Sequence, residues 1–237
     1  MKTIVHKAES RGFADHGWLS SKHTFSFAGY HNPDRVHFGA LRVLNDDQVA
    51  AGKGFGTHPH DNMEIVSIPL FGDLAHKDST GTEKVIKSGD VQIMSAGSGL
   101  RHSEYNHSKD DEVQFLQIWV FPKERDIEPR YEQKSFSAED RMNKFQTVVS
   151  PEDSSAVWIN QDAFFSLANL DAGTELTYEV KKTGNGVYLF VLNGDITIAD
   201  EKLDTRDAIG VTEANSVDLK ANSYAEVLAI EVPMELG

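Results

Sequence analysis

Short apolar runs follow one another along the chain, and each is broken after a few residues by Gly, Asp, Asn or Ser. The runs are rich in Val, Ile, Phe and Leu, and no long stretch has the 3.6-residue period of an amphipathic helix. This rhythm is typical of an all-β sandwich or barrel. The clearest runs cover residues 38–44, 64–70, 91–94, 113–121, 187–192 and 225–232.

The signals of the first half recur in the same order in the second half. Gly72-Asp73 and Gly194-Asp195 each follow an apolar run, and a Glu-Lys-aliphatic triplet comes soon after, at 83–85 and at 201–203. Residues 115–118 and 227–230 both lead to a proline. Short strands can resemble one another by chance, but three matches in the same order favour a duplicated domain. Asn193-Gly194, set between two apolar runs, also predicts a β-hairpin.

The repeat predicts two all-β domains, each a sandwich or a barrel, with few short helices. We expect an N-terminal domain at 1–122, a linker at 123–139 and a C-terminal domain at 140–237. The expected linker is polar and carries Pro129 soon after Pro122. Polar, proline-containing segments are where domain boundaries commonly fall.

Composition excludes several classes of function. The 237 residues include 23 basic and 37 acidic side chains, for a formal net charge of −14, so direct binding to nucleic acid or to an anionic membrane is not expected. The chain has no cysteine, which rules out disulfides, thiolate nucleophiles and iron–sulfur centres. It shows neither an apolar signal core nor a membrane-spanning segment. We expect a cytoplasmic protein.

All ten histidines lie at or before His107. His58 and His60 are two apart, and so are His102 and Glu104. Because residues two apart in a strand share a face, each pair projects its side chains together. The 41 residues between the pairs are enough for strands that bring the two pairs face to face.

Three imidazoles and one carboxylate form a site suited to a divalent transition metal, with one or two positions left open. A lone histidine on a strand is usually just solvated. The combination of His-x-His with a glycine-rich turn and His-x-Glu favours a metal site instead.

These residues carry a resemblance to the cupins, through Gly52-x5-His58-x-His60-x3-Glu64 and Gly89-x5-Ser95-x-Gly97-x4-His102-x3-Asn106. More narrowly, the sequence resembles the pirin family and its bacterial quercetinase-like members. The resemblance is dense over about the first 135 residues and rests on 11–12 with 16–19, 24–28, 41–47, 54–60, 94–106 and 129–133.

The resemblance implies a bicupin, two double-stranded β-helix barrels of which only the first keeps a metal site. It implies that His58, His60, His102 and Glu104 are the ligands of one divalent ion. Fe(II) is the first expectation, with Mn, Ni, Cu, Co or Zn as alternatives. Two features depart from the common cupin pattern. Ser95 stands where cupins usually have proline, and many cupins use the carboxylate at the place of Glu64. Since Glu64 shares strand parity with His58 and His60, we expect it to point inward as a hydrogen-bonded partner.

The resemblance also implies a function, a quercetin 2,3-dioxygenase that opens a flavonol ring with O2 and loss of carbon monoxide. Glu104 would accept the proton of the flavonol 3-hydroxyl. The alternative is a pirin-like regulatory protein that binds a metal and a protein partner without turning over flavonols. A cupin isomerase or sugar-binding cupin is a third possibility.

Several other residues receive provisional roles. Phe55, Met63 and Ile93 are candidates to line the pocket, and Arg42 is a candidate ion-pair partner of Asp46. Solvated positions are expected for His76 and His107, with a position beside the metal ligands as the alternative. The remaining aromatic and histidine side chains of the N-terminal segment are expected to pack in the core or to cap the barrel mouth, and they are Trp18, Phe25, Phe27, His16, His23, His31 and His37.

Overall fold

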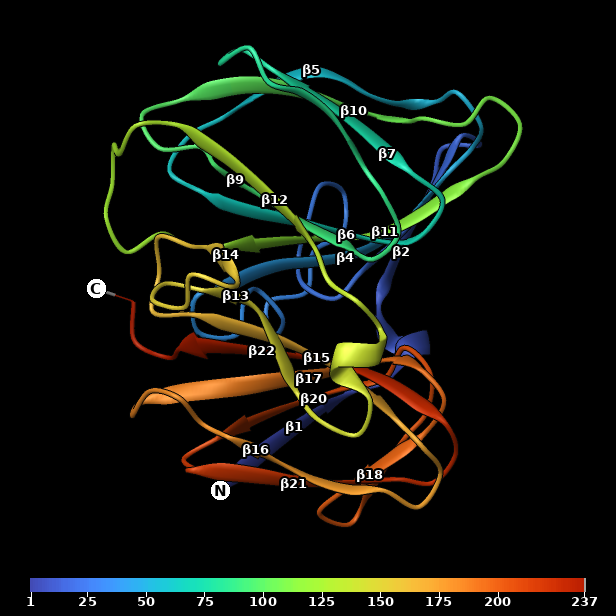
Figure 1. Cartoon of the computed structure of the whole chain (residues 1–237), viewed down its shortest axis with the longest axis vertical. Coiled ribbons are helices and arrows are strands. Elements are labelled where there is room, and N and C mark those ends of the chain that lie inside the picture. The colour runs from blue at the N-terminus through green and yellow to red at the C-terminus, as the bar shows by residue number, and fades with distance from the viewer. Residues whose placement is uncertain (237) are drawn as a thin grey trace.

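A computed structural model describes residues 1–236, and nearly all of its regular structure is β (Figure 1). The helices among these residues are two short 3-10 turns, η1 (Ala8–Ser10) and η2 (Glu139–Arg141). Within residues 1–236, neither of these helices is long and apolar enough to cross a membrane. The strands form two stacked barrels, which confirms the expected all-β bicupin.

Each barrel is built from one seven-stranded sheet and one four-stranded sheet. In the N-terminal barrel the larger sheet has the order β12 (Arg130–Ser135), β9 (Asp90–Ser95), β6 (Glu64–Phe71), β11 (Val113–Val120), β4 (Leu41–Val49), β3 (Leu19–His23) and β2 (Gly12–Asp15). The smaller sheet has the order β5 (Gly54–His60), β10 (Leu100–Asn106), β7 (Leu74–Asp78) and β8 (Glu83–Ile86).

The C-terminal barrel repeats this plan except at one edge strand, whose pairing is parallel in this barrel and antiparallel in the first. Its larger sheet has the order β1 (Lys2–His6), β20 (Ala208–Thr212), β17 (Asn185–Asn193), β22 (Ala225–Pro233), β15 (Phe164–Leu170), β13 (Gln146–Ser150) and β14 (Val157–Trp158). Its smaller sheet has the order β16 (Glu175–Glu179), β21 (Ser216–Ala221), β18 (Ile196–Ile198) and β19 (Glu201–Leu203). The matching order supports the duplication inferred from sequence.

Two strands cross the expected domain boundaries. β1 falls within 1–122, yet it pairs antiparallel with β20 in the C-terminal barrel. β12 falls within the expected linker 123–139, yet it pairs with β9 in the N-terminal barrel. Each barrel therefore receives one edge strand of its larger sheet from the segment that precedes the other barrel: β12 joins the first barrel, and β1 joins the second. Local composition could not show this exchange, because a polar edge strand and a linker have the same kind of sequence.

The predicted hairpin at Asn193-Gly194 is wrong. β17 and β18 lie in different sheets, and β18 pairs with β19 and β21 instead. Gly194 has φ +80°, and a Cβ there would lie 2.0 Å from the carbonyl oxygen of Tyr224. Glycine is needed here because the chain turns sharply from one sheet to the other. Gly72, its counterpart in the first barrel, also has positive φ.

The two seven-stranded sheets face each other across one apolar core. Alternate residues of β11, Leu116 and Ile118, point toward the second barrel and join a cluster that includes Phe190 and Ile230. These side chains are fully buried, and each contributes on the order of 2 kcal/mol of stability. The residue between them, Gln117, faces the interior of the first barrel. Sheets buried on both faces explain why the apolar runs are continuous rather than alternating.

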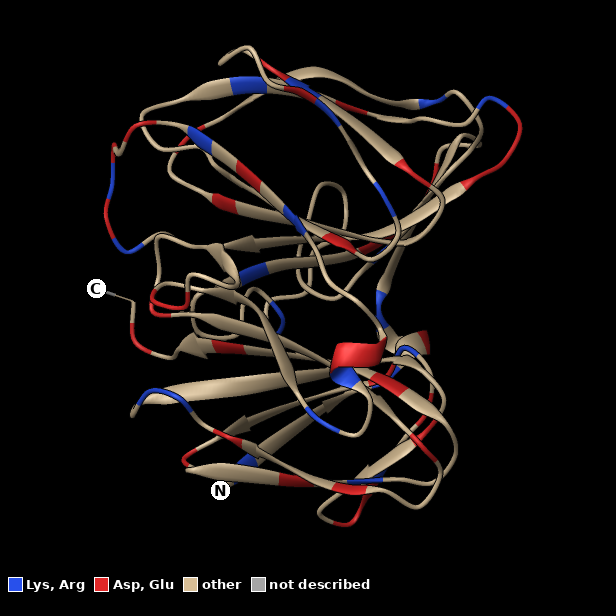
Figure 2. Ribbon diagram, viewed as in Figure 1, with Lys and Arg blue, Asp and Glu red and all other residues tan. Residues whose placement is uncertain are grey.

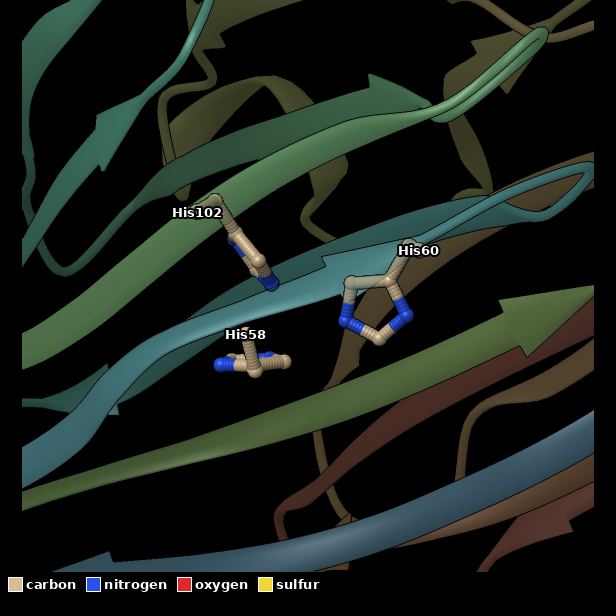
Figure 3. Close-up of side chains that lie close together, drawn as sticks. All are labelled: His58, His60 and His102. Atoms are coloured by element: carbon tan, nitrogen blue, oxygen red, sulfur yellow. The ribbon is translucent and has the colours of Figure 1, made fainter.

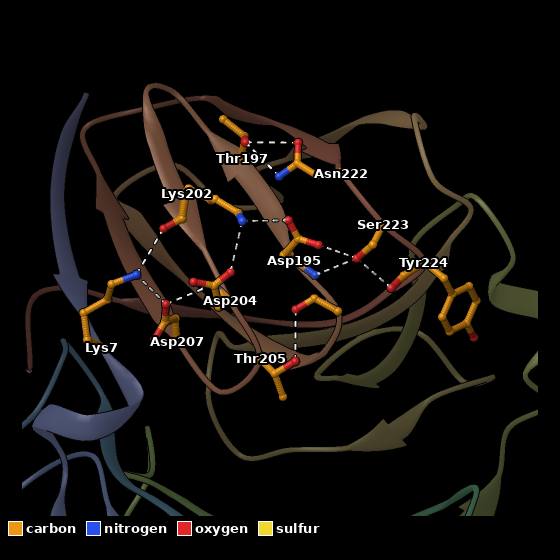
Figure 4. Close-up of polar contacts among 11 residues, drawn as sticks. Lys7, Asp195, Thr197, Lys202, Asp204, Thr205, Asp207, Asn222, Ser223 and Tyr224 are labelled. Carbon is orange, nitrogen blue, oxygen red and sulfur yellow. Dashed lines mark hydrogen bonds and ion pairs between the residues drawn. The ribbon is translucent and has the colours of Figure 1, made fainter.

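Polar contacts attach the residues that follow β1 to the second barrel (Figure 4). Lys7 Nζ lies 2.5 Å from Asp207 Oδ2, and the backbone N–H of Ala8 donates to Asp207 Oδ1 over 2.8 Å.

The expected pair of Arg42 with Asp46 is not formed. Arg42 donates to the carbonyls of Ser26 and Val36, and Asp46 accepts from Arg206 across the domain interface at 3.0 Å.

His6, the last residue of β1, is buried between the barrels. Its Nδ1 lies 2.8 Å from the hydroxyl of Tyr188, and its ring packs against Phe25. Burial, followed by the charge of Arg35, lowers the pKa of His6 to about 4. In the unfolded chain His6 has an ordinary pKa near 6.5.

This pKa difference predicts a pH-dependent loss of stability. As pH falls from about 6.5 to about 4, the unfolded chain binds a proton at His6 that the folded protein does not. The free energy of unfolding therefore falls across that window, by up to about 3 kcal/mol from this residue. Urea denaturation of metal-free protein at pH 7.5 and pH 5 measures the difference.

His6→Gln, which keeps a hydrogen-bonding group but cannot titrate in this range, should lose less stability between the two pH values than the wild type. The other histidines titrate equally in both proteins and cancel. An identical loss in both proteins would show that His6 does not carry the effect.

Candidate metal centre

Three imidazoles converge on the inner face of the four-stranded sheet (Figure 3). His58 on β5 lies directly opposite His102 on β10, and His60 is two residues further along β5. One ring nitrogen from each lies within 4.8 Å of the others, and the ring centroids are 4.5–4.9 Å apart. The parity argument from sequence therefore predicted this convergence correctly.

The surroundings leave lone pairs free on these rings. His58 Nδ1 lies 2.8 Å from the carbonyl oxygen of Gly56, so Nδ1 carries the proton and Nε2 presents a lone pair. His102 is 1% exposed, and neither of its nitrogens has a hydrogen-bond partner. Burial lowers the pKa of His60 to about 4 and also lowers that of His102. The buried and unpartnered imidazole of His102 fits a metal ion, because it would otherwise lose hydrogen bonds to water without replacement.

Glu104 is two residues beyond His102 on β10 and is 1% exposed. Its Oε1 accepts from Ser67 Oγ at 3.1 Å, and its Oε2 accepts from Gln117 Nε2 at 2.7 Å. Burial raises the pKa of this carboxyl to about 7. Glu104 and His102 form a close group with His76, so the carboxylate lies beside the three-histidine cluster, on the side of His102.

His76 is buried rather than solvated, contrary to expectation. It lies opposite Glu104 on the neighbouring strand β7, and its Nε2 is 2.9 Å from Asp78 Oδ2. Sequence reasoning favoured a solvated position because the strand carries a single histidine. The sequence did contain a signal for a paired position, because His76 and Asp78 are two residues apart and therefore share a strand face. His107 is exposed, as expected.

Glu64 does not share the site with the histidines. Strand β5 ends at His60, and Asn62 has φ +46°, so the turn breaks the parity that a continuous strand would have kept. The Oε2 of Glu64 accepts from Ser95 Oγ at 2.8 Å and from the backbone N–H of Asn160 at 3.1 Å. Glu64 therefore joins the two barrels, and Ser95, in the place of the usual proline, supplies one of its partners.

A pocket of about 710 Å3 opens beside His58 and His60. The N-terminal segment forms much of its wall, as its expected role at the barrel mouth implied. Phe55 lines the pocket, but Met63 packs beside the Ile65 cluster and Ile93 lies in the core between the barrels. Of the aromatic residues expected in the core, Phe25 lies there, whereas Trp18 and Phe27 line the pocket. Two histidines of the same segment, His16 and His23, also line the pocket.

The interior of the second barrel is chemically different. Its inward-facing cluster is almost entirely aliphatic, and Ala229 occupies the place that corresponds to Gln117. A buried carboxylate is present, Glu231, but its oxygens accept from Tyr178, Asn185 and the backbone N–H groups that follow β16. Among its strands in the described residues the one histidine is His6 of β1, which packs against Tyr188 and Phe25 between the barrels, so this barrel has no counterpart of the cluster.

Fold and site together define a two-barrel cupin with one histidine cluster. The pirin family model matches residues 5–120, and the model described as quercetinase C-terminal cupin domain matches residues 147–232. The chain belongs to the pirin family.

Relatives match nearly the full length. The chain is 40% identical over 230 residues to a quercetin 2,3-dioxygenase of Escherichia coli K12, covering 97% of this chain and 98% of that one. It is 40% identical over 222 residues to a pirin-like protein of Caulobacter vibrioides, covering 93% and 95%. The crystal structure of the E. coli bacterial pirin YhhW in complex with nickel(II) superposes with a TM-score of 0.92 at 39% identity, covering 98% and 99%.

Acidic and basic residues are interspersed over the ribbon of both barrels (Figure 2). With an overall charge of −14, this arrangement offers no reason to expect an anionic polymer as ligand.

If His58, His60 and His102 bind an ion, removing one imidazole should weaken binding by more than about 100-fold, since even loss of an outer partner costs 10- to 100-fold. Added Ni(II) or Fe(II) should raise the melting temperature of the chelator-treated wild type but not that of His58→Ala. Exposed His31, outside the cluster, provides the control His31→Ala, which should respond like the wild type. Equal metal-induced shifts in all three proteins would refute the site.

Proposed function

We propose that this protein is a dioxygenase of the quercetin 2,3-dioxygenase type, with a single divalent ion held by His58, His60, His102 and Glu104. The observation that carries the proposal is the convergence of three imidazoles, two of which, His58 and His60, line an aromatic-walled pocket. The E. coli relative named for this activity, similar over nearly its whole length, supports the same assignment.

The bound ion would act as a Lewis acid that lowers the pKa of a flavonol hydroxyl and favours reaction of the electron-rich ring with O2. Glu104 would accept the proton of the 3-hydroxyl. Ser67 and Gln117 hold both of its oxygens, so the carboxylate keeps one orientation as the substrate enters. Its burial makes proton uptake easier than at an ordinary glutamate.

The aromatic walls suit a flat, three-ring substrate. Trp18 and Phe55 pack edge to face at 5.4 Å, as do Phe27 and Trp119. Trp119 also contacts the ring of His60. These walls would hold the substrate against the histidine cluster and exclude water from the reacting ring. The pocket volume lies within the range of small-molecule sites.

Within this proposal Fe(II) remains the first ion to test, as the family resemblance implies. Histidine and carboxylate ligands suit several divalent metals, and the availability of the metal often decides which one is bound. The nickel complex of the E. coli bacterial pirin makes Ni(II) the second ion to test. A cytoplasmic location also remains a prediction.

The proposal predicts oxygen-dependent loss of quercetin. Chelator-treated protein is reloaded separately with Fe(II), Ni(II), Mn(II), Cu(II), Co(II) or Zn(II), and quercetin is followed at its visible absorption band under air and under argon, with carbon monoxide measured in the headspace. At least one ion should support turnover under air alone. Glu104→Gln keeps the shape of the side chain but accepts no proton, so it should reduce turnover by about 100-fold or more.

His31→Ala again serves as the unaffected control. Stoichiometric metal binding through the three histidines, with no turnover on any of the six ions, would overturn the dioxygenase. It would favour the alternative expected from sequence, a metal-binding regulatory protein.

A further inference from the structure

A row of polar side chains crosses the wall of the pocket away from the histidine cluster. His23 on β3 lies opposite Asn45 on β4, and Asn45 lies opposite Gln117 on β11. All three line the pocket. Gln117 donates to Glu104, so the row begins at the proposed metal centre and runs across three neighbouring strands toward the N-terminal segment.

The outer two members of this row lack partners. Asn45 is 2% exposed and His23 is 3% exposed. Asn45 Oδ1 and His23 Nδ1 are buried atoms with no hydrogen bond. Whichever way the Asn45 amide is turned, one end accepts and the other donates. Burial, followed by the charge of His16, lowers the pKa of His23, so this ring is neutral at pH 7 and also offers one donor and one acceptor.

The adjacent row shows that this lack of partners is not a general property of the wall. Ser21 and Asp47 occupy the same two strands, two residues away from His23 and Asn45, and they hydrogen-bond to each other. Leu19 and Val49, in the next row, are apolar. Unpaired polar groups reduce stability, and an apolar side chain at Asn45 or His23 would avoid that loss. Their presence in the pocket wall points to a ligand that completes them.

Geometry limits the kind of ligand. Strands β3 and β11 are two strand spacings apart, about 10 Å, which is comparable to the length of a flavonol. A molecule whose 3-hydroxyl lies at Glu104 would extend along the row and bring its distant hydroxyls to Asn45 and His23. A phenolic hydroxyl both donates and accepts, so it can satisfy either group.

We propose that His23 and Asn45 form a subsite that recognises the ring hydroxyls of a polyhydroxylated flavonol, away from the hydroxyl that reacts. This inference rests on the proposed function, because it takes a flavonol as the ligand of the pocket. The subsite selects quercetin over 3-hydroxyflavone, which has the reacting hydroxyl but no others. It acts on affinity and not on chemistry, since neither residue reaches the reacting ring.

Binding without turnover tests the subsite separately from catalysis. Zn(II)-loaded protein is titrated under argon with quercetin and with 3-hydroxyflavone, and quenching of tryptophan fluorescence gives each Kd. The wild type should bind quercetin at least about tenfold more tightly, the factor that one or two buried hydrogen bonds supply. Asn45→Leu should abolish most of this preference and change the affinity for 3-hydroxyflavone by less than about threefold.

His23→Phe, which keeps the packing against Phe27 and Tyr30, provides a second variant should Asn45→Leu fail to fold, and thermal melts report folding. Phe13 lines the pocket outside the row, so Phe13→Leu should weaken both compounds together and keep their ratio.

Each outcome has one meaning. Equal affinity of the wild type for the two compounds, or an unchanged ratio in the folded variants, would overturn the subsite. Loss of the ratio in the variants establishes the subsite even if no ion supports turnover, in which case only the dioxygenase is overturned. Binding of neither compound would overturn both proposals.

Discussion

Burial of each seven-stranded sheet on both faces is the constraint on which the rest of the structure depends. One face packs against the other barrel, and the opposite face lines its own barrel. On β11 this assigns Leu116 and Ile118 to the interface and leaves Gln117 and Trp119 in the pocket. Because strand alternation separates the two tasks residue by residue, polar groups can occupy the barrel interior without weakening the contact between barrels.

The two barrels use this freedom in opposite ways. The second fills its interior with aliphatic side chains and satisfies the buried carboxylate of Glu231 with hydrogen bonds from a single loop and its neighbours. The first buries His102, Asn45 and His23 with atoms that lack partners, each of which reduces stability. The second barrel therefore fills its interior mainly with aliphatic side chains, whereas the first places unsatisfied groups of Asn45 and His23 at a pocket, where a ligand can complete them.

Period-two reasoning predicted the fold class and the convergence of His58, His60 and His102 because each pair lies within one unbroken strand. It failed at Glu64, because the chain makes a left-handed turn at Asn62. The tertiary structure determines that turn, and the alternation of residues along a strand does not predict it. It also missed His76 and the exchange of β1 and β12. Contacts between segments far apart in sequence, such as β1 with β20, leave no local signal in composition or periodicity.

The exchange of β1 and β12 also bears on how such a chain arises. If a single-barrel precursor paired its leading strand with a second copy, the result would be a strand-swapped dimer. Joining the two copies end to end would then give the present topology without any rearrangement of strands. In this arrangement, the segment that precedes each barrel also completes a sheet edge of the other barrel. A cut within 123–139 would separate at least one barrel from a strand it needs, exposing backbone groups that promote aggregation.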